Sequence, residues 1–510
     1  MKADIIILGG GSAGWMTAAT LIKTFPTKKI FLIESPDTPT VGVGESTLGY
    51  INRWLEFLQI KDEDFMPYTD ASYKLSIRFE NFYKLNDGGF HYPFGSPIES
   101  NLSLGKQNWY VQKYFNKHLP NSDYANFISS SMPLVNSNKL FKNENNELPG
   151  FDFKTDTAYH FDATKFGTWL KNNYCIPKGV KHIVQDVKNI RVNNEGIESL
   201  DGFKADIFFD CTGFKSLLMS KIGGNFLSYS DLLPNNKAWA TRVPYKNKEK
   251  ELEPFTNCTA IENGWVWNIP SWERIGTGYV YSDKYVTDEE ALEQFKKHLD
   301  YKKHDYSNSS FKNISMRVGR FEKIFYKNVC AMGLAAGFIE PLESNGLLSV
   351  HEFLLNLLDV FERHDSLTQY DKDCFNLKCA NFFDNFTDFV AQHYALSKRD
   401  DTKYWKDIHN KSFLKLAKSD SIFKDMAVRY DVGADNQYFS SQYGEHYIMT
   451  GMNFYSQTLK NLTQLNIPFP HRVREIVSEN KRRNNDVKEW NNVVHNKPTL
   501  LEFLKTNIHK

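Results

Sequence analysis

The sequence predicts an α/β fold, and three observations in its first 34 residues support this prediction. Residues 4–8 form an apolar run of strand length, followed at once by 9–14, Gly-Gly-Gly-Ser-Ala-Gly, which matches the pattern Gly-x-Gly-x-x-Gly. Apolar residues then recur at helical spacing and stop before Pro26. A second strand-like run, 29–33, ends at Glu34. Strand, glycine turn, helix and strand in this order are typical of a parallel βαβ unit.

This unit has the features of a dinucleotide site. Its glycines would let backbone amides and the helix N-terminus approach a pyrophosphate, and Glu34, 20 residues after Gly14, would offer a carboxylate to a ribose hydroxyl. A glycine pattern alone also fits an ordinary turn, but the flanking elements favour nucleotide binding and leave NAD or FAD open. The candidate cofactor-binding residues here are Gly9, Gly11, Ser12, Ala13, Gly14 and Glu34.

The rest of the chain continues the alternation of strand and helix patterns to about residue 360 and is mainly helical afterwards. Residues 206–210 form another apolar strand, which ends in a small-residue turn at Gly213. Residues 353–360 have helical spacing, so the glycine-rich segment 337–346 before them is predicted to be a loop leading into a helix. The polar stretch 136–147 is predicted to be an exposed loop.

Composition excludes several classes of partner. The chain has 510 residues, of which 41% are hydrophobic and 15% aromatic, so it can bury a large core. Lys plus Arg (62) balance Asp plus Glu (61), which gives no electrostatic reason to expect nucleic acid or an anionic membrane. No run of 18 apolar residues predicts a membrane span, and we expect a cytoplasmic protein. Six scattered cysteines predict reduced thiols and no metal site.

Further motifs follow the fingerprint along the chain. On these motifs the sequence resembles the flavin-dependent halogenases of the tryptophan-halogenase family, from residue 4 to about residue 410. Several motifs are shared with flavin monooxygenases in general, but the Trp-x-Trp-x-Ile-Pro box and the Phe-x-x-Pro-x-x-Ser-x-Gly pattern are not. The motifs are 41–47 (Val-Gly-Val-Gly-Glu-Ser-Thr), Tyr73-Lys74, 159–163 (Tyr-His-Phe-Asp-Ala), 210–213 (Asp-Cys-Thr-Gly), 264–270 (Gly-Trp-Val-Trp-Asn-Ile-Pro), 337–346 and 397–402.

The resemblance implies a fold and an activity. The fold is an FAD-binding Rossmann-like core of the flavin monooxygenase type, interleaved with a substrate-side β-sheet over residues 1–360, with a mainly helical, substrate-covering region over 361–510. The activity is a halogenase reaction in which FADH2, O2 and a halide ion (chloride, bromide or iodide) give hypohalous acid, which halogenates an electron-rich aromatic substrate. No second glycine fingerprint for a nicotinamide is present, so a separate flavin reductase would supply FADH2. Self-association into a homo-oligomer is left open.

The resemblance also implies roles around the flavin. Trp265 and Trp267 alternate on one strand, so their rings face the same side and would wall the flavin off from the organic substrate; on spacing alone they would be ordinary core aromatics. The amides of Asn345 and Gly346 would form an anion nest for the halide. Further cofactor-binding residues are Gly44, Glu45, Ser46, Thr47, Gly213, Gly333 and Leu334.

Three residues are implied as catalytic. Lys74 would meet hypohalous acid, either as a hydrogen-bond donor or by forming a haloamine. An isolated lysine is usually solvated, but the apolar residues around Lys74 suggest a partly buried amine. Glu343 would polarise the oxidant or take the proton lost by the arene, although in isolation it fits a helix N-terminal acid. Ser344 would be a relay between the flavin side and the substrate side of the wall formed by Trp265 and Trp267.

The identity of the substrate is the property that the sequence constrains least. Tyr92 and Phe94 offer faces for a flat ring. Tryptophan-specific members carry a long aromatic segment that corresponds to the interval between Tyr430 and Gly451; the interval is short here, and its Tyr438, Tyr443, His446 and Tyr447 do not reproduce the segment, which disfavours free tryptophan. In this respect the chain is similar to marine bacterial or viral halogenases of broad acceptance.

Two alternatives remain at this stage. One is a flavin-dependent aromatic hydroxylase or other monooxygenase of the same fold. In the wider monooxygenases an acidic residue follows the glycine of the Gly333 stretch, whereas here it is Leu334, which favours halogenation. The other is a non-catalytic binding protein that keeps an FAD fold without making an oxidant.

Overall fold

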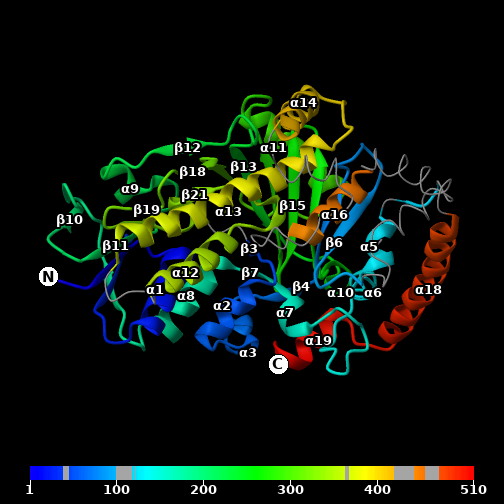
Figure 1. Cartoon of the computed structure of the whole chain (residues 1–510), viewed down its shortest axis with the longest axis horizontal. Coiled ribbons are helices and arrows are strands. Elements are labelled where there is room, and N and C mark those ends of the chain that lie inside the picture. Colours follow the sequence, from blue (N-terminus) through cyan, green and yellow to red (C-terminus); the bar gives the residue numbers. More distant parts are fainter. Residues whose placement is uncertain (38–44, 99–117, 121, 362–366, 419–440, 454–469) are drawn as a thin grey trace.

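Two large β-sheets organise the molecule, and long helices pack across them (Figure 1). The predicted α/β class is confirmed, including the helical C-terminal region. The computed structural model describes residues 1–37, 45–98, 118–120, 122–361, 367–418, 441–453 and 470–510.

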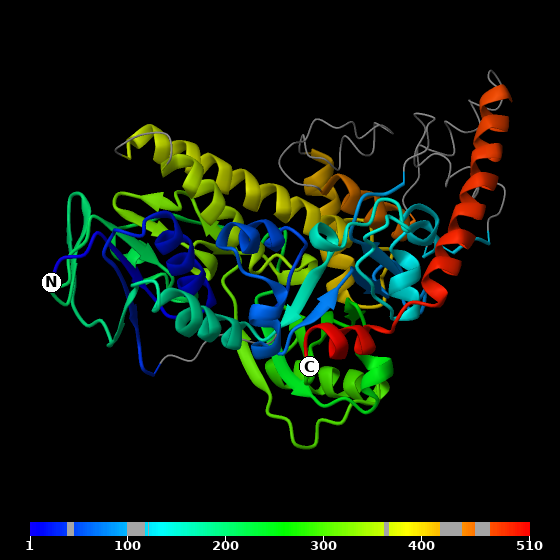
Figure 2. The same cartoon turned by 90° about the horizontal axis from the view of Figure 1, so that it is seen from below.

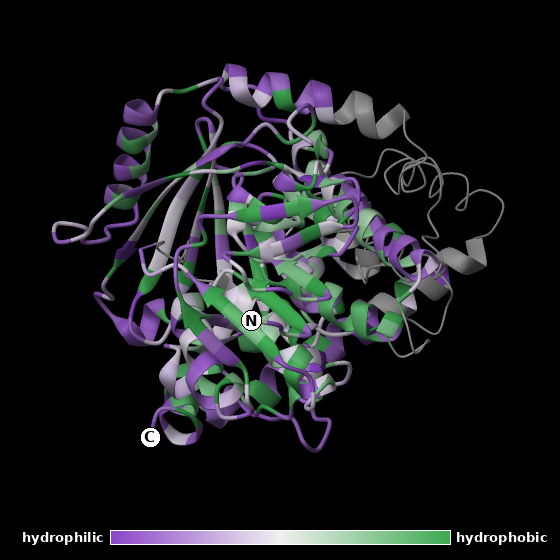
Figure 3. Cartoon of the chain, turned by 90° about the vertical axis from the view of Figure 1, so that its left-hand side faces the viewer, coloured by the Kyte–Doolittle hydropathy of each residue, from purple (hydrophilic) through white to green (hydrophobic). Residues whose placement is uncertain are grey.

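The first sheet is the predicted nucleotide-binding sheet, with strand order β19-β20-β11-β1-β2-β8. Its strands are parallel except β19, and Ile5 of β1 lies between Ile207 and Ile30 of the neighbouring strands. All four residues of β1 are buried, as expected for a parallel sheet covered on both faces, and the strands beside the N-terminus are coloured hydrophobic in Figure 3. Its strands are β1 (Ile5–Leu8), β2 (Ile30–Glu34), β8 (Lys181–Val184), β11 (Ile207–Asp210), β19 (Phe325–Tyr326) and β20 (Val329–Ala331).

The second sheet has seven strands in the order β17-β13-β16-β15-β14-β5-β6. Its pairs are antiparallel except β14 with β5. Trp265 and Trp267 on β15 belong to the main hydrophobic core, whereas Val266 between them belongs to a second cluster on the other face. The predicted common face of the two indoles is therefore correct. The strands are β5 (Ser76–Glu80), β6 (Gly89–Pro93), β13 (Lys237–Val243), β14 (Phe255–Ile261), β15 (Gly264–Pro270), β16 (Ile275–Tyr281) and β17 (Lys312–Ser315).

Small sheets connect these layers. In the order β3-β7-β4, His160 on β7 pairs with Ser46 on one side and with Ser72 on the other, so Ser46 and Lys74 come close although 28 residues apart. The segment 337–346 begins in another small sheet, β12-β18-β21. The strands of the small sheets are β3 (Glu45–Ser46), β4 (Ser72–Lys74), β7 (Ala158–Phe161), β9 (Ile190–Asn193), β10 (Gly196–Leu200), β12 (Phe226–Ser228), β18 (Gly319–Phe321) and β21 (Gly337–Phe338).

The helices fit the predicted periodicity. Helix α1 ends before Pro26, and α12 contains the predicted 353–360. Helix α13 is capped by Thr368 and runs across the molecule between β19 and α16 (Figure 1). It therefore packs against the nucleotide-binding sheet at one end and against the helix that covers the second sheet at the other. Helix α18 extends along one edge (Figure 2). The longer helices are α1 (Ser12–Thr24), α2 (Ile51–Leu58), α8 (Ala163–Trp169), α11 (Asp288–Tyr301), α12 (Leu348–Phe361), α13 (Gln369–Ala395), α14 (Lys403–Lys418), α16 (Ser441–Gly451), α18 (Pro470–His495) and α19 (Leu500–Asn507).

Short helices and turns complete the chain. The prediction of an exposed loop over residues 136–147 is only partly correct. Helix α6 covers the first two of these residues, and Asn143 is buried with its side-chain amide donating to the carbonyls of Leu148 and Phe151. Within the described residues, no helix combines the length and apolarity that a bilayer crossing requires. The short elements are α3 (Asp62–Phe65), α5 (Asp123–Ile128), α6 (Met132–Ser137), α7 (Phe153–Asp156), α9 (Leu217–Lys221), α10 (Lys248–Glu251), η1 (Met66–Tyr68), η2 (Leu170–Cys175), η3 (Gly213–Lys215), η4 (Gly333–Ala335) and η5 (Pro341–Glu343).

Candidate active site

The glycine turn after β1 has no room for side chains. A Cβ on Gly9, whose φ is +113°, would lie 2.3 Å from the carbonyl oxygen of Cys211, and one on Gly14 would lie 1.9 Å from the carbonyl oxygen of Gly9. A Cβ on Gly10 would lie 2.2 Å from the Glu34 carboxyl carbon, so the Glu34 side chain lies over the turn, and its contact with a ribose stays a prediction. The glycines leave bare backbone where a pyrophosphate would lie.

The N-terminus of α1 supplies the other half of this cradle. Its N-cap is Gly11, which has no side chain to cap the helix. The first backbone N–H groups of the helix therefore remain available to a bound anion. Ser12 instead donates its hydroxyl to the Ala163 carbonyl at 2.8 Å. His182, which the sequence analysis missed, places Nε2 2.7 Å from Glu34 Oε2. The residues present therefore fit a dinucleotide such as FAD.

Three more predicted cofactor residues lie around this cradle. Gly333 has φ +61°, and a Cβ there would lie 2.8 Å from the Ala13 side chain, so η4 packs directly on the start of α1. Leu334 follows it and is partly buried. Gly213, with φ +64°, turns the chain just after β11. Gly44, also predicted to bind the cofactor, lies outside the described residues.

Lys74 is fully buried at the end of β4. Its Nζ donates to the Thr47 carbonyl at 2.9 Å and to Ser344 Oγ at 2.7 Å, and it lies 5.0 Å from the centre of the Phe94 ring. Burial lowers the pKa of Lys74 to about 7, although Cys258 and Glu343 act in the opposite direction. An amine with this pKa is neutral in a large fraction of molecules near neutral pH, which is the form that reacts with an electrophile.

The pKa of Lys74 has a consequence for stability. Its folded-state pKa lies below the ordinary 10.5, so the folded protein binds fewer protons than the unfolded chain between about pH 7 and 10.5, and stability rises with pH in that window. The full burial cost, on the order of 5 kcal/mol, applies only below pH 7. In Lys74→Met this rise should disappear from the FAD-free protein. Urea unfolding from about pH 6 to about pH 9 measures it, and equal slopes for both proteins would contradict the shift.

A buried hydrogen-bond chain continues from Lys74. Ser344 Oγ lies 3.1 Å from Ser46 Oγ, which lies 2.5 Å from Thr256 Oγ1, and Thr256 lies 2.9 Å from His160 Nε2. His160 Nδ1 is 3.1 Å from the Pro270 carbonyl, which can only accept, so Nδ1 carries a proton and Nε2 accepts from Thr256. Ser344 thus connects Lys74 to this chain, and its relay role stays a prediction. Thr256 was missed because no local pattern sets it apart, and His160 belongs to the 159–163 motif but was assigned no role.

Glu343 is the second fully buried group of the predicted catalytic set. Burial raises the pKa of its carboxyl group, and His393 and Lys74 oppose that rise. Its Oε1 lies 2.8 Å from Nε2 of His393, which comes from α13 and is also fully buried. Ser344 follows Glu343 with φ +58°, and this left-handed turn aims consecutive side chains at Lys74 and at His393.

The indole of Trp265 is held by a buried carboxyl group. Trp265 Nε1 donates to Glu340 Oε2 at 3.0 Å, and the same oxygen accepts from Asn235 Nδ2 at 2.7 Å and from the Tyr394 hydroxyl at 3.0 Å. Burial raises the pKa of Glu340. The ring centres of Trp265 and Trp267 are 6.3 Å apart in an edge-to-face arrangement. Glu340 was missed by the sequence analysis because a Glu before a proline carries no special signal.

The predicted halide residues follow directly. Asn345 is 5% exposed, and its amide group contacts the Ile339 carbonyl at 3.4 Å. Among the described residues, the backbone N–H groups of Asn345 and Gly346 have no hydrogen-bond acceptor, which suits an anion. The segment 337–346, which was predicted to be a loop, contains the short strand β21 and the short helix η5 before α12 begins.

The predicted aromatic stack is covered on one side. Tyr92 stacks on Tyr447 of α16 with ring centres 5.7 Å apart, and Phe94 meets Tyr92 edge to face. A Cβ on Gly444 would lie 2.9 Å from Tyr92 Cζ, so this glycine lets α16 approach β6. Phe94, which contacts Lys74, is the predicted aromatic residue nearest the chemistry. In the interval 430–451, residues 430–440 lie outside the described residues, as do the side chains of Tyr443 and His446.

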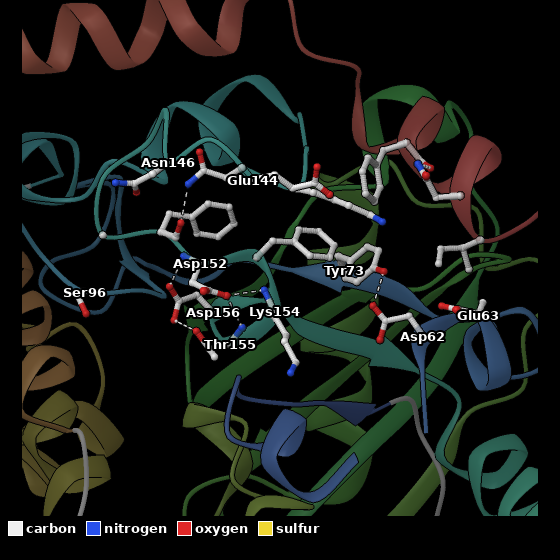
Figure 4. Close-up of a pocket in the computed structure, with 18 of the residues that line it drawn as sticks. Asp62, Glu63, Tyr73, Ser96, Glu144, Asn146, Asp152, Lys154, Thr155 and Asp156 are labelled. Carbon is white, nitrogen blue, oxygen red and sulfur yellow. Dashed lines mark hydrogen bonds between the residues drawn. The ribbon is translucent and has the colours of Figure 1, made fainter. Parts of the chain in front are cut away.

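A surface pocket of about 990 Å³ lies elsewhere (Figure 4). Tyr73, the neighbour of Lys74 on β4, lines it and donates to Asp62 Oδ2 at 2.6 Å, while the Tyr159 hydroxyl donates to Asp62 Oδ1 at 2.7 Å. Because successive strand residues face opposite sides, Lys74 points away from this pocket and is not in its lining. The pocket is therefore distinct from the candidate active site.

Comparison with known proteins agrees with this geometry. The model of the family described as tryptophan halogenase matches residues 4–466. The chain belongs to the tryptophan halogenase family. The tryptophan 6-halogenase SttH of Streptomyces toxytricini is 33% identical over 428 residues, covering 79% of this chain and 80% of SttH, and its crystal structure superimposes with a TM-score of 0.83.

Two further solved structures are similar over nearly the whole chain. The apo structure of VirX1 is 37% identical with a TM-score of 0.89 and covers all of both chains. Tar14, described as a tryptophan C-6 flavin-dependent halogenase, is 27% identical with a TM-score of 0.81 and covers 99% of each chain. The protein is thus an FAD-dependent halogenase, and enzymes of this family need a separate flavin reductase. The hydroxylase and the non-catalytic alternative are both disfavoured.

Proposed function

We propose that this halogenase transfers a halogen to an electron-rich aromatic substrate other than free tryptophan, through Lys74. The observation that carries the proposal is the fully buried amine of Lys74, which lies 2.7 Å from Ser344 Oγ. Burial lowers the pKa of this amine to about 7. A flavin reductase is the partner that delivers FADH2, and chloride, bromide or iodide is the halide.

The cofactor is held by the glycine turn and the α1 N-terminus, with Glu34 toward the ribose. Bound FADH2 supplies the oxidation of halide by O2 to hypohalous acid. Trp265 and Trp267 exclude the organic substrate from that reaction, and the Asn345 and Gly346 amides hold the halide beside it.

Lys74 then acts as the acceptor of the electrophilic halogen. Its neutral nitrogen forms a bond to the halogen of hypohalous acid and releases water, with the amine proton joining the hydroxide. The arene next attacks that halogen, and the nitrogen–halogen bond breaks. Glu343 takes the proton lost by the ring carbon and returns it to the Lys74 nitrogen, which restores the neutral amine. Atoms and charges balance, and the product is the haloarene.

The substrate class follows from the chemistry of this site. A halogen carried on nitrogen is a mild electrophile, so phenols and indoles react while poorer rings do not. Phe94 offers a ring face beside the amine. The short interval between residues 430 and 451 lacks the long aromatic segment expected around a free amino acid. A flat ring without an amino-acid group is the substrate that these features favour.

A bromination panel tests this proposal. Purified protein with a flavin reductase, NADH, FAD and bromide is offered phenols, indoles and free tryptophan, and products are read by the bromine isotope pattern in mass spectrometry. We expect bromide-dependent bromination of several phenols or indoles and at least about tenfold slower reaction of free tryptophan. If free tryptophan is the best substrate, the substrate proposal is wrong. An oxygenated product formed without bromide would contradict the halogenase chemistry itself.

A further inference from the structure

His393 connects a distant helix to the proposed proton acceptor. It lies on α13, 50 residues after Glu343, and both side chains are 0% exposed. Nε2 of the imidazole lies 2.8 Å from Glu343 Oε1, although the angle is outside that of a good hydrogen bond. Neither oxygen of Glu343 has a hydrogen-bond partner of good geometry among the described residues, so the two oxygens differ only in that Oε1 is in close contact with His393. Oε1 therefore lies against His393, while Oε2 is the oxygen left for the reaction.

The position of Nδ1 determines how many protons this pair holds. Nδ1 lies 3.2 Å from the Val390 carbonyl and 3.3 Å from the Phe389 carbonyl. Carbonyl oxygens only accept, so Nδ1 carries a proton. If Nε2 and Glu343 were both unprotonated, two electron-rich atoms would lie 2.8 Å apart in a buried site with no proton between them, which is unfavourable. The pair therefore holds one further proton, shared between imidazole and carboxyl.

The surroundings isolate this proton from solvent. Phe79, Phe82 and Phe389 surround the imidazole, with ring centres 4.7, 6.1 and 5.7 Å from it. The titratable groups that act on the pair are Lys74 and Cys258 beside Glu343 and Glu340 beside His393. With aromatic rings around the imidazole, Glu343 and not water is the neighbour that interacts with its Nε2 proton.

We propose that His393 is a positioning residue that shares one proton with Glu343 and keeps this carboxylate oriented and ready to accept the proton of the arene. The proposal rests on the proposed function of Glu343 and extends it to a residue on another helix. We place the shared proton on the imidazole side of the pair, which leaves Glu343 able to accept a further proton. Oε2 accepts the arene proton and passes it to Lys74, and His393 keeps its own proton throughout, so the pair returns to its starting state.

A double-mutant cycle tests the coupling. His393→Leu removes the partner, Glu343→Gln removes the acceptor, and the double variant combines them. We expect His393→Leu to slow halogenation by about 10- to 100-fold and to leave flavin reoxidation by O2 unchanged. Because a charged His393 favours ionised Glu343, its loss should also move the acid limb of the pH profile to higher pH. In the Glu343→Gln background, His393→Leu should have little further effect. Equal slowing in both backgrounds would overturn the proposal.

Two matched variants separate positioning from simple packing. His393→Gln keeps a donor but holds no titratable proton, so it should recover much of the rate without restoring the wild-type pH limb. It also carries the test if His393→Leu fails to fold, because a pH limb identical to that of the wild type would then contradict the proposal. His298→Leu, a partly buried histidine on α11 remote from the site, should leave the rate and the pH profile unchanged.

An activity-independent measurement distinguishes this proposal from the proposed function. Infrared difference spectra of the FAD-free protein against Glu343→Gln isolate the carboxyl group of Glu343. We expect an ionised carboxylate at neutral pH in the wild type and a protonated acid in His393→Leu. Identical spectra would overturn the pairing even if the enzyme halogenates. The expected spectra without any halogenation would leave the pair intact and remove the catalytic function instead.

Discussion

Lys74→Ala should lower the rate of aromatic halogenation by at least about 10³-fold. The variant removes the atom that carries the halogen to the substrate, and no other described lysine donates to Ser344. The flavin half-reaction should continue, because the indoles and the glycine turn that serve it do not contact the Lys74 amine. The measurement is the rate of brominated product by mass spectrometry, beside the rate of flavin reoxidation by absorbance.

Two controls sharpen this result. Lys74→Arg keeps a positive charge and hydrogen-bond donors but cannot become a neutral amine, since a guanidinium group stays protonated in proteins. It should be as inactive as the alanine variant if the nitrogen bonds the halogen, and partly active if the side chain only donates hydrogen bonds to hypohalous acid. Lys296→Ala removes a lysine that pairs with Glu293 on α11 and should behave as wild type. Full halogenating activity in Lys74→Ala would remove the role assigned to this lysine.

Glu343→Gln should lower halogenation by about 10²- to 10⁴-fold, the range typical of a lost general base. Glutamine has the same shape and still fits beside His393, but it cannot accept the proton of the arene. The loss of that proton should then become rate-limiting. A ring-deuterated substrate measures this directly: a hydrogen isotope effect should appear in the variant and be small in the wild type.

The outcome that contradicts this role is equally concrete. Unchanged turnover in Glu343→Gln would show that water or another base removes the proton. A matched variant is Glu340→Gln, three residues earlier in the same loop, which also removes a buried carboxyl group. Glu340→Gln should leave the isotope effect small, because Glu340 contacts Trp265 and not the reacting atoms. The substitution only weakens the hydrogen bonds that this side chain accepts, such as that from Trp265.

The sequence predicts the parts of this site that rest on local patterns. The βαβ unit follows from an apolar run, a glycine turn and helical spacing within 34 residues. Burial of Lys74 follows from its neighbours, because Ala71, Tyr73, Leu75 and Ile77 are indeed at most 2% exposed. The common face of Trp265 and Trp267 follows from the two-residue period of a strand.

The missed residues meet only through the tertiary structure. His393 reaches Glu343 because α13 crosses the sheets, and Thr256 reaches Ser46 because β14 and the small sheet of β3 converge 210 residues apart. Neither has a sequence signal of its own, since a histidine in an apolar helix face is usually a core residue. The stacking of Tyr447 on Tyr92 likewise depends on how closely Gly444 lets α16 approach.

The most direct test of the central claim, that the halogen passes from the flavin compartment to the Lys74 amine, is a competition for hypohalous acid. Wild type and Lys74→Ala turn over FADH2 and bromide with an aromatic substrate and a small soluble scavenger that traps free hypobromous acid. The account predicts brominated arene with little trapped bromine in the wild type, and nearly all bromine in the scavenger for Lys74→Ala. Equal partition in the two proteins would contradict it, because the oxidant would then reach the substrate without the lysine.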